Sequence, residues 1–158
     1  MESPTVGFEY EWEPFLFEGR HLTFEEHRHA RLSRPRCSHW GAAVYKWEGV
    51  ITEGKHDAQV GVLIGETGDL RQRIKQYISG TQEAGNKYWR DQFLTRGNLR
   101  LFVLRFPQAT IHTATGESET VGMVDLVSDN LRLVLEQVLV WRGSARRSAK
   151  RWIINRRL

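Results

Sequence analysis

The sequence has little that would build a disulfide-stabilised or membrane-spanning protein. One cysteine, Cys37, occurs among 158 residues, so no intramolecular disulfide can form, which favours a reducing compartment. No apolar run approaches the ~20 residues that a membrane span requires. The first residues are acidic and aromatic, and they lack the basic and apolar regions of a secretory signal. These absences predict a cytoplasmic protein without a membrane partner.

Disorder and repeats are also not indicated. Proline is scarce, with 4 residues, while 40% of the residues are hydrophobic and 27% are charged, as in ordinary globular chains. The length suits one domain with its own core. No repeat or linker divides the chain. Differences in composition and charge along the chain still suggest three parts of one globule: an N-terminal extension over residues 1–38, a core over 39–141 and a basic helix over 142–158.

Acidic residues are missing from the last 17 positions, Arg142–Leu158, which hold seven basic residues. The net charge of +4 therefore combines a slightly acidic body with a basic terminus. Basic clusters attract phosphates. This segment is predicted to be a helix that either binds a nucleic-acid backbone or remains solvated without a partner. The candidate phosphate-binding residues are Arg146, Arg147, Lys150 and Arg151.

Two elements are predicted in the N-terminal extension. Aromatic residues alternate with glutamates from Phe8 to Glu13, which indicates a half-buried strand, and Pro14 ends it. A charged helix follows within Leu22–Arg36, with Thr23 as N-cap and Glu26 completing a capping box. We interpret its histidines as residues of a solvated helix rather than a metal site. The extension could cover a sheet edge or mediate homodimerisation.

Three strands are predicted in the core. Ala42–Trp47 and Gln59–Ile64 are rich in small and β-branched residues, and the short connection between them favours antiparallel pairing. Leu99–Phe106 alternates in the same way and is expected to end at Pro107, before a polar loop over Gln108–Thr120.

Amphipathic spacing predicts the core helices. One begins near the candidate N-cap Thr67, buries residues at i, i+4, i+7 and i+8 from Leu70, and ends before Gly80. A short helix is expected around Trp89. Another, Asp129–Arg142, is capped by Ser128 and is apolar on nearly all sides, so we expect it to be largely buried.

Four side chains are candidates for chemistry. Glu136 projects from an apolar helix, where a carboxylate needs a cation, a hydrogen-bond donor or a metal, and the alternative interpretation is a structural ion pair with an arginine. Arg73 and Tyr77 lie one turn apart on a helix, and Arg73 could bind a phosphate or simply pack along the surface. Tyr45 lies near the end of the first core strand, and taken alone it is interpreted as a core tyrosine whose hydroxyl reaches water.

The order of these residues resembles the GIY-YIG nuclease family over roughly Trp40–Trp141. Val44 and Tyr45 match the end of the first motif, and Ile64 and Gly65 match the end of the second. Downstream of Gly65, the spacing E-T-x-x-L-x-x-R-x-x-x-Y also matches in type. The resemblance implies an α+β fold with a small three-stranded antiparallel sheet flanked by helices.

The same resemblance implies metal-dependent hydrolysis of phosphodiester bonds, with DNA preferred to RNA as substrate. Tyr45 would act as general base, Arg73 would stabilise the phosphoryl transition state, and Tyr77 would position water or relay a proton. Glu136 would bind Mg²⁺ or Mn²⁺ through oxygen ligation.

One departure from the family pattern weakens the expectation of activity. Leu63 replaces the tyrosine of the second motif, and a leucine supplies no hydroxyl group. Tyr77, Lys46 or Lys87 could compensate. Alternatively, the chain is a non-catalytic nucleic-acid-binding module, or a protein-interaction domain with an acidic partner.

Overall fold

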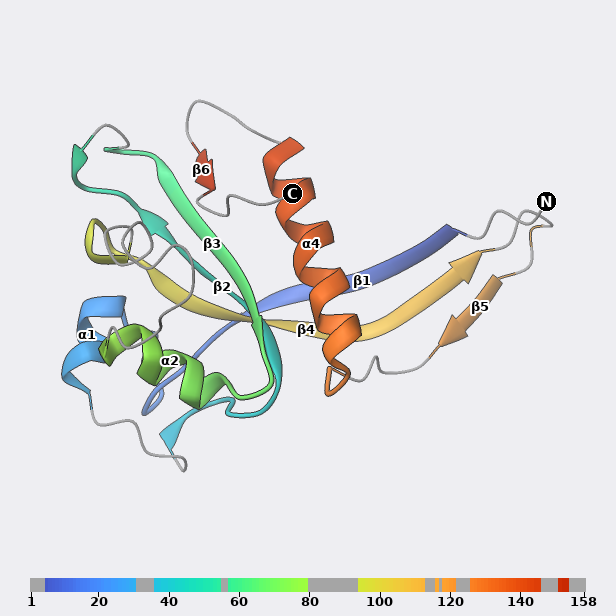
Figure 1. Cartoon of the computed structure of the whole chain (residues 1–158), viewed down its shortest axis with the longest axis horizontal. Coiled ribbons are helices and arrows are strands. Elements are labelled where there is room, and N and C mark those ends of the chain that lie inside the picture. Colours follow the sequence, from blue (N-terminus) through green and yellow to red (C-terminus); the bar gives the residue numbers. More distant parts are fainter. Residues whose placement is uncertain are drawn as a thin grey trace.

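The computed structural model shows an α+β fold, with helices packed on one open, largely antiparallel sheet (Figure 1). The three named helices of the described part are α1 (Phe24–His29), α2 (Leu70–Ser79) and α4 (Asp129–Ala145). The structure describes residues 5–30, 36–54, 57–79, 94–112, 116, 118–121, 126–145 and 151–153. None of the helices within those ranges is long and apolar enough to cross a membrane.

The sheet has six strands in the order β1-β4-β2-β3-β6, and β5 pairs with the outer part of β4. The predicted antiparallel core is confirmed, because β2 pairs with both β3 and β4. The predicted three-stranded sheet is too small, since the strand predicted in the N-terminal extension, β1, joins it together with β5 and β6. The strands are β1 (Thr5–Pro14), β2 (Ala43–Val50), β3 (Val60–Thr67), β4 (Arg100–His112), β5 (Ser118–Val121) and β6 (Arg151–Ile153).

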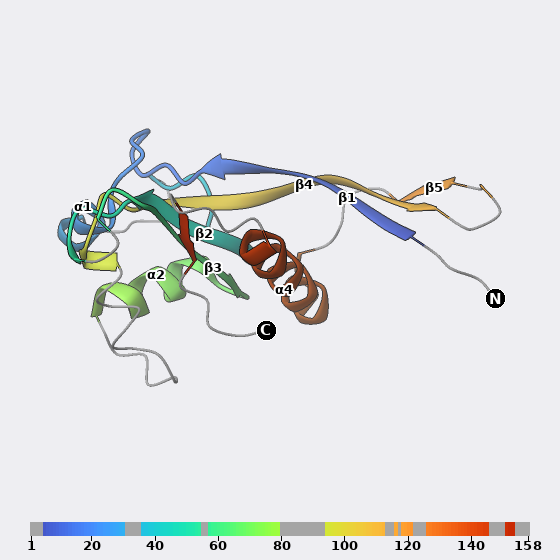
Figure 2. The same cartoon turned by 90° about the horizontal axis from the view of Figure 1, so that it is seen from above.

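The N-terminal extension is part of the sheet. Strand β1 ends at Pro14 as predicted and pairs antiparallel with β4, and the two form a long ribbon that projects from the body (Figures 1 and 2). The capping box of α1 is also confirmed, because Thr23 and Glu26 exchange backbone and side-chain hydrogen bonds. The helix is shorter than predicted and not fully solvated, since Phe24 and His27 are buried.

Strand β4 continues through Pro107, where its end was predicted, and occupies the start of the expected loop. The reason is a bulge on β4, because Glu9 faces Gln108 while Glu11 faces Arg105, so that two residues of β4, Phe106 and Pro107, stand opposite Tyr10 alone. Such a bulge leaves a position outside the regular ladder, where the missing N–H of proline costs no hydrogen bond.

The predicted basic C-terminal helix over 142–158 is wrong in the part that the structure describes. Residues up to Ala145 extend α4, and Arg151–Ile153 form β6, which pairs parallel with β3 through Val60–Val62. Pairing of this kind depends on a partner strand about ninety residues away in the sequence. The hydrophobic periodicity of a short segment contains no information about a partner so distant in the sequence.

The core lies on both faces of β2 and β3, between α2 on one side and α4 on the other (Figure 2). Successive side chains of β2 point to opposite faces of the sheet, so each face receives every second residue. Tyr45 and Trp47 face α2 and pack with Leu70, Ile74 and Tyr77. Val44, with Val62 and Ile64 of β3, faces α4 and packs with Leu135, Leu139 and Val140.

Helix α4 is less buried than predicted. Leu133, Val134, Val138 and Trp141 are between 46% and 60% exposed. Only the stripe that contains Leu135 and Leu139 meets the sheet, because a straight helix on a sheet can bury one side. Its N-terminus is capped as predicted, with Ser128 accepting a hydrogen bond from the backbone N–H of Leu131.

Candidate functional site

The hydroxyl groups of Tyr45 and Tyr77 meet in the core between β2 and α2. Their oxygens are 2.7 Å apart, the rings pack edge to face, and both residues are buried. Tyr77 reaches this position because it continues the buried stripe of α2. The helix begins at Leu70, and Asp69 rather than the predicted Thr67 caps it, since the Asp69 carboxylate accepts a hydrogen bond from the N–H of Gln72.

Gly65 makes room for Tyr45. The two residues are directly opposed in the β2–β3 register, and a Cβ atom on Gly65 would lie 2.5 Å from the Tyr45 hydroxyl oxygen. The Tyr45 side chain therefore lies across β3. Of the other motif residues, Val44 and Ile64 lie in the core on the opposite face, beneath α4, and their role is packing.

Arg73 lies beside this tyrosine pair. Its positive charge opposes the rise in the pKa of Tyr45 and also the rise in the pKa of Glu136. The side chain is half-buried, and its buried Nε has no hydrogen-bond partner in the part of the chain that the structure describes. A guanidinium group with an unused donor in such a place can bind an oxyanion.

Glu136 completes the group from α4. Burial, together with the negative charge of Glu66, raises the pKa of Glu136 from 4.5 to about 7. Among the described residues no lysine, arginine or histidine lies within 4 Å of its carboxylate, so the predicted alternative of a structural arginine pair is not seen there. A half-buried carboxylate without a cation is suited to binding one.

Burial makes Tyr45 a poor proton acceptor in the free protein. Burial and the neighbouring Tyr77 raise the pKa of Tyr45 well above 10, against the opposing charge of Arg73. Tyr45 is therefore a neutral phenol at neutral pH. An anionic form would need further positive charge close by.

Leu63 contributes no polar group. It is buried opposite Trp47 in the α2-side core. Lys46 does not replace the missing hydroxyl, because it points to the opposite face of β2 from Tyr45. There its ammonium contacts Glu48 and lies 5.0 Å from the rings of Trp12 and Phe102. Lys87 lies outside the described residues, which leaves Tyr77 as the described hydroxyl beside Tyr45.

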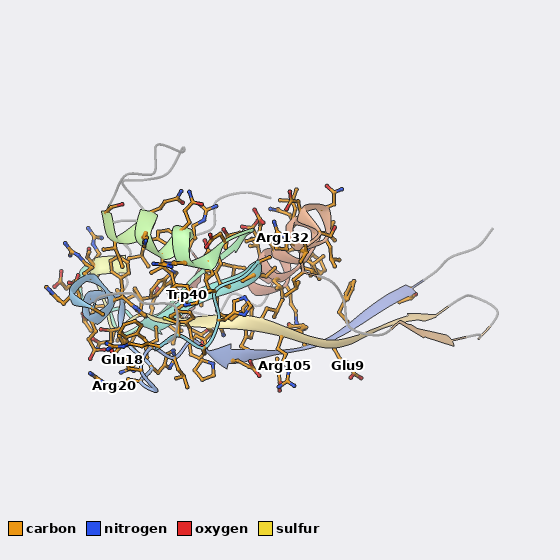
Figure 3. All side chains as sticks on the ribbon, turned by 90° about the horizontal axis from the view of Figure 1, so that it is seen from below. Glu9, Glu18, Arg20, Trp40, Arg105 and Arg132 are labelled. Atoms are coloured by element: carbon orange, nitrogen blue, oxygen red, sulfur yellow. The ribbon has the colours of Figure 1, made fainter. Side chains whose placement is uncertain are left out.

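Two charged residues near the site were missed from the sequence. Glu66, the next-to-last residue of β3, raises the pKa of Glu136. Arg132 of α4, labelled in Figure 3, forms an ion pair with Glu66 at 3.0 Å and is almost fully buried. A signal was present, because Arg132 is the only basic residue between Asp129 and Trp141 and lies one turn before Glu136.

The predicted nucleic-acid-binding residues remain predictions. Arg146, Arg147 and Lys150 lie outside the described residues, as does Trp89, and Arg151 is placed only by its backbone in β6.

Within the described residues, no group of three or more histidine, cysteine or acidic side chains could hold a metal ion. His27 faces the rings of Phe15 and Trp47 in the core. Glu136 and Glu66 still fit Mg²⁺ or Mn²⁺ chemically, because magnesium sites often use one or two carboxylates together with water and substrate phosphates.

Comparisons of the chain with models of protein families, with curated proteins and with solved structures find no match.

Proposed function

We propose that this protein is a metal-dependent endonuclease that hydrolyses phosphodiester bonds in DNA with a site of the GIY-YIG type. One observation carries the proposal. Tyr45 of β2 shares a hydrogen bond with Tyr77 of α2, and the charges of Arg73 of α2 and Glu136 of α4 both act on Tyr45, so that three separate elements contribute to its surroundings. These are the four residues that the family resemblance singles out.

Glu136 would hold the divalent cation, with Glu66 as the second carboxylate nearby. When bound, such a cation neutralises phosphate charge and stabilises the leaving oxygen. The burial of Glu136 supports this role, because a carboxylate that is poorly solvated and unpaired among the described residues gains most from a cation.

Arg73 would bind the phosphoryl oxygens on which negative charge increases during the reaction. Its Nε is buried and has no partner to displace among the described residues. Donors fixed in advance and partly shielded from water stabilise developing charge more strongly than solvent does.

Tyr45 and Tyr77 would orient the attacking water and accept its proton. With its own proton donated to Tyr77, the Tyr45 oxygen can accept a hydrogen bond from water and orient it. To act as general base, Tyr45 must have its pKa lowered, and Arg73 supplies one of the positive charges that do so.

The second candidate function is a nucleic-acid-binding module without turnover. Two observations favour it: Leu63 is a buried core residue, and burial keeps Tyr45 protonated. In both functions the basic residues Arg146, Arg147, Lys150 and Arg151 would bind the phosphate backbone, which gives affinity without sequence specificity.

Cleavage of plasmid and oligonucleotide substrates in Mg²⁺ and Mn²⁺ separates the two functions. We expect wild-type protein to cut DNA, and Arg73→Ala, Glu136→Gln and Tyr45→Phe each to lose roughly 100-fold or more in rate. Arg105→Ala is the matched arginine control, because Arg105 lies on the β1–β4 ribbon and pairs with Glu11 and Glu13 (Figure 3).

Cutting that survives both Arg73→Ala and Glu136→Gln would show that the site is wrongly assigned. Salt-sensitive binding of DNA or RNA without any cutting would establish the binding module instead. Parallel DNA and RNA substrates also test the predicted preference for DNA.

A further inference from the structure

Arg132 connects the chain segments that carry the candidate site. Its Nε donates to the carboxylate of Glu66 at the end of β3, over 3.0 Å. Its Nη1 donates to the carbonyl oxygens of Leu126 and Val127, just before α4, over 2.7 and 2.8 Å. Its Nη2 donates to the carboxylate of Asp129 in the first turn of α4. One guanidinium group thus holds the start of α4 against the end of β3.

The environment of Arg132 makes this connection rigid. The residue is 3% exposed, so its guanidinium group is shielded from water on most sides, although the Asp129 carboxylate that it contacts is exposed. Its Nη2 would lie 3.5 Å from a Cβ atom on Gly68, which places the group against the turn between β3 and α2 as well. The planar fork of an arginine makes these bonds in fixed directions, whereas a lysine could not make them together.

Glu136 lies one helical turn after Arg132, on the same side of α4. Arg132 bonds with Glu66 of β3, and β3 packs against α4 in the same core cluster. The rotation of α4 about its axis, and its depth on β3, therefore determine where the Glu136 carboxylate lies. Arg132 fixes both.

We propose that Arg132 is a positioning residue that holds Glu136 beside Arg73 and Tyr45, an assignment that rests on the proposed nuclease function. Arg132 does not bind substrate, because it is buried and its donors are engaged within the protein. Its effect reaches the reaction through the place of the Glu136 carboxylate. Residues that orient a metal-binding side chain typically change metal affinity or activity by ~10–100-fold when altered.

The test is Arg132→Lys, which keeps the charge but not the fork. Arg105→Lys is the matched control, since Arg105 forms ion pairs on the exposed ribbon. Three quantities are measured for each protein: Mn²⁺ affinity by electron paramagnetic resonance without DNA, kcat and KM on an oligonucleotide, and the ¹⁹F spectrum after 3-fluorotyrosine labelling. The chain has 4 tyrosines, so the signals of Tyr45 and Tyr77 can be assigned by substitution.

We expect Arg132→Lys to weaken Mn²⁺ binding and to lower kcat, each by ~10–100-fold. KM for DNA should stay within about 2-fold, because Arg132 does not face the substrate. The ¹⁹F signals of Tyr45 and Tyr77 should stay in place, since that pair is held between β2 and α2. Arg105→Lys should match the wild type in all three measurements.

A lower melting temperature with unchanged Mn²⁺ affinity and kcat would overturn the assignment and leave Arg132 a stabilising residue only. If Arg132→Lys does not fold, Asp129→Asn removes the charge of one Arg132 partner whose side chain is 89% exposed. A loss of Mn²⁺ affinity of a few-fold supports the assignment, and unchanged affinity overturns it. Wild-type protein that neither binds Mn²⁺ nor cuts DNA would instead show that the proposed function is wrong, and this assignment with it.

Discussion

The hydroxyl group of Tyr45 lies 2.7 Å from that of Tyr77, and it reaches this place by crossing Gly65. The position of the Tyr45 ring therefore depends both on Gly65 of β3 and on Tyr77 of α2. Gly65, the glycine of the second motif, has a steric role here, because a side chain at this position would occupy the space that the Tyr45 ring fills.

Gly65→Ala should displace Tyr45. The added Cβ atom would lie 2.5 Å from the tyrosine oxygen, so the ring must move. We expect a loss of about 1–3 kcal/mol in the free energy of unfolding and a fall of about 100-fold in cleavage rate. Urea unfolding and the cleavage assay measure the two effects. Gly41→Ala is the control, since the nearest atom to its Cβ is 3.8 Å away; equal effects at both positions would contradict the steric role.

The two tyrosine hydroxyl groups should be energetically coupled. We expect Tyr45→Phe and Tyr77→Phe each to destabilise the protein, and the double substitution to cost less than the sum by about 1 kcal/mol, because each single change removes the same hydrogen bond. Urea unfolding of the four proteins completes this double-mutant cycle. Strict additivity would mean that the hydrogen bond contributes nothing to stability.

His27 and Glu136 should affect stability in opposite directions as pH changes. Burial lowers the pKa of His27 from 6.5 to about 4, so the unfolded chain binds a proton that the folded chain does not. Stability from this group falls as pH drops from about 6.5 to 4. The pKa of Glu136 is raised to about 7, so the folded chain keeps a proton that the unfolded chain loses. Stability from this group falls as pH rises from about 4.5 to 7.

Variants should separate these two opposing contributions. Glu136→Gln leaves His27, and the free energy of unfolding should then rise by up to about 3 kcal/mol between pH 4 and 6.5. His27→Leu leaves Glu136, and stability should fall over the same range. Urea unfolding at a series of pH values gives both slopes. Identical profiles for wild type and the two variants would refute the assignment of these groups.

The basic residues near the C-terminus should control DNA affinity separately from chemistry. Replacing Arg146, Arg147, Lys150 and Arg151 by glutamine should weaken binding. The slope of log K against log salt should become shallower by about 0.9 for each phosphate that the protein no longer neutralises. Fluorescence anisotropy at several salt concentrations measures both quantities. An unchanged affinity and slope would exclude these residues from DNA binding.

Local sequence patterns predicted the elements whose stabilising interactions are close in the sequence. The strand from Ala43 was found from its small and β-branched residues, and the start of α1 from the Thr23–Glu26 capping box. Both signals arise from neighbouring residues. The same is true of the buried stripe of α2, which brought Tyr77 into the candidate site.

Features that depend on distant partners were not predicted. The continuation of β4 through Pro107 requires a bulge in its pairing with β1, and β6 requires β3 as a partner. The burial of His27 follows from Phe15 and Trp47, which come from other strands or connections. Arg132 was missed for the same reason, because its role depends on an ion pair with Glu66, which is distant in the sequence.

The sheet topology also bears on the order of folding. Both flanking strands, β1 and β6, pair with strands roughly ninety or more residues away in the sequence, so their formation closes long loops. The β2–β3 hairpin needs only local closure. Refolding should therefore start at this hairpin with α2 and add the flanks later. Until β4 is in place, β1 is an aromatic-rich strand without its partner, and the nascent chain is most prone to aggregate during that interval.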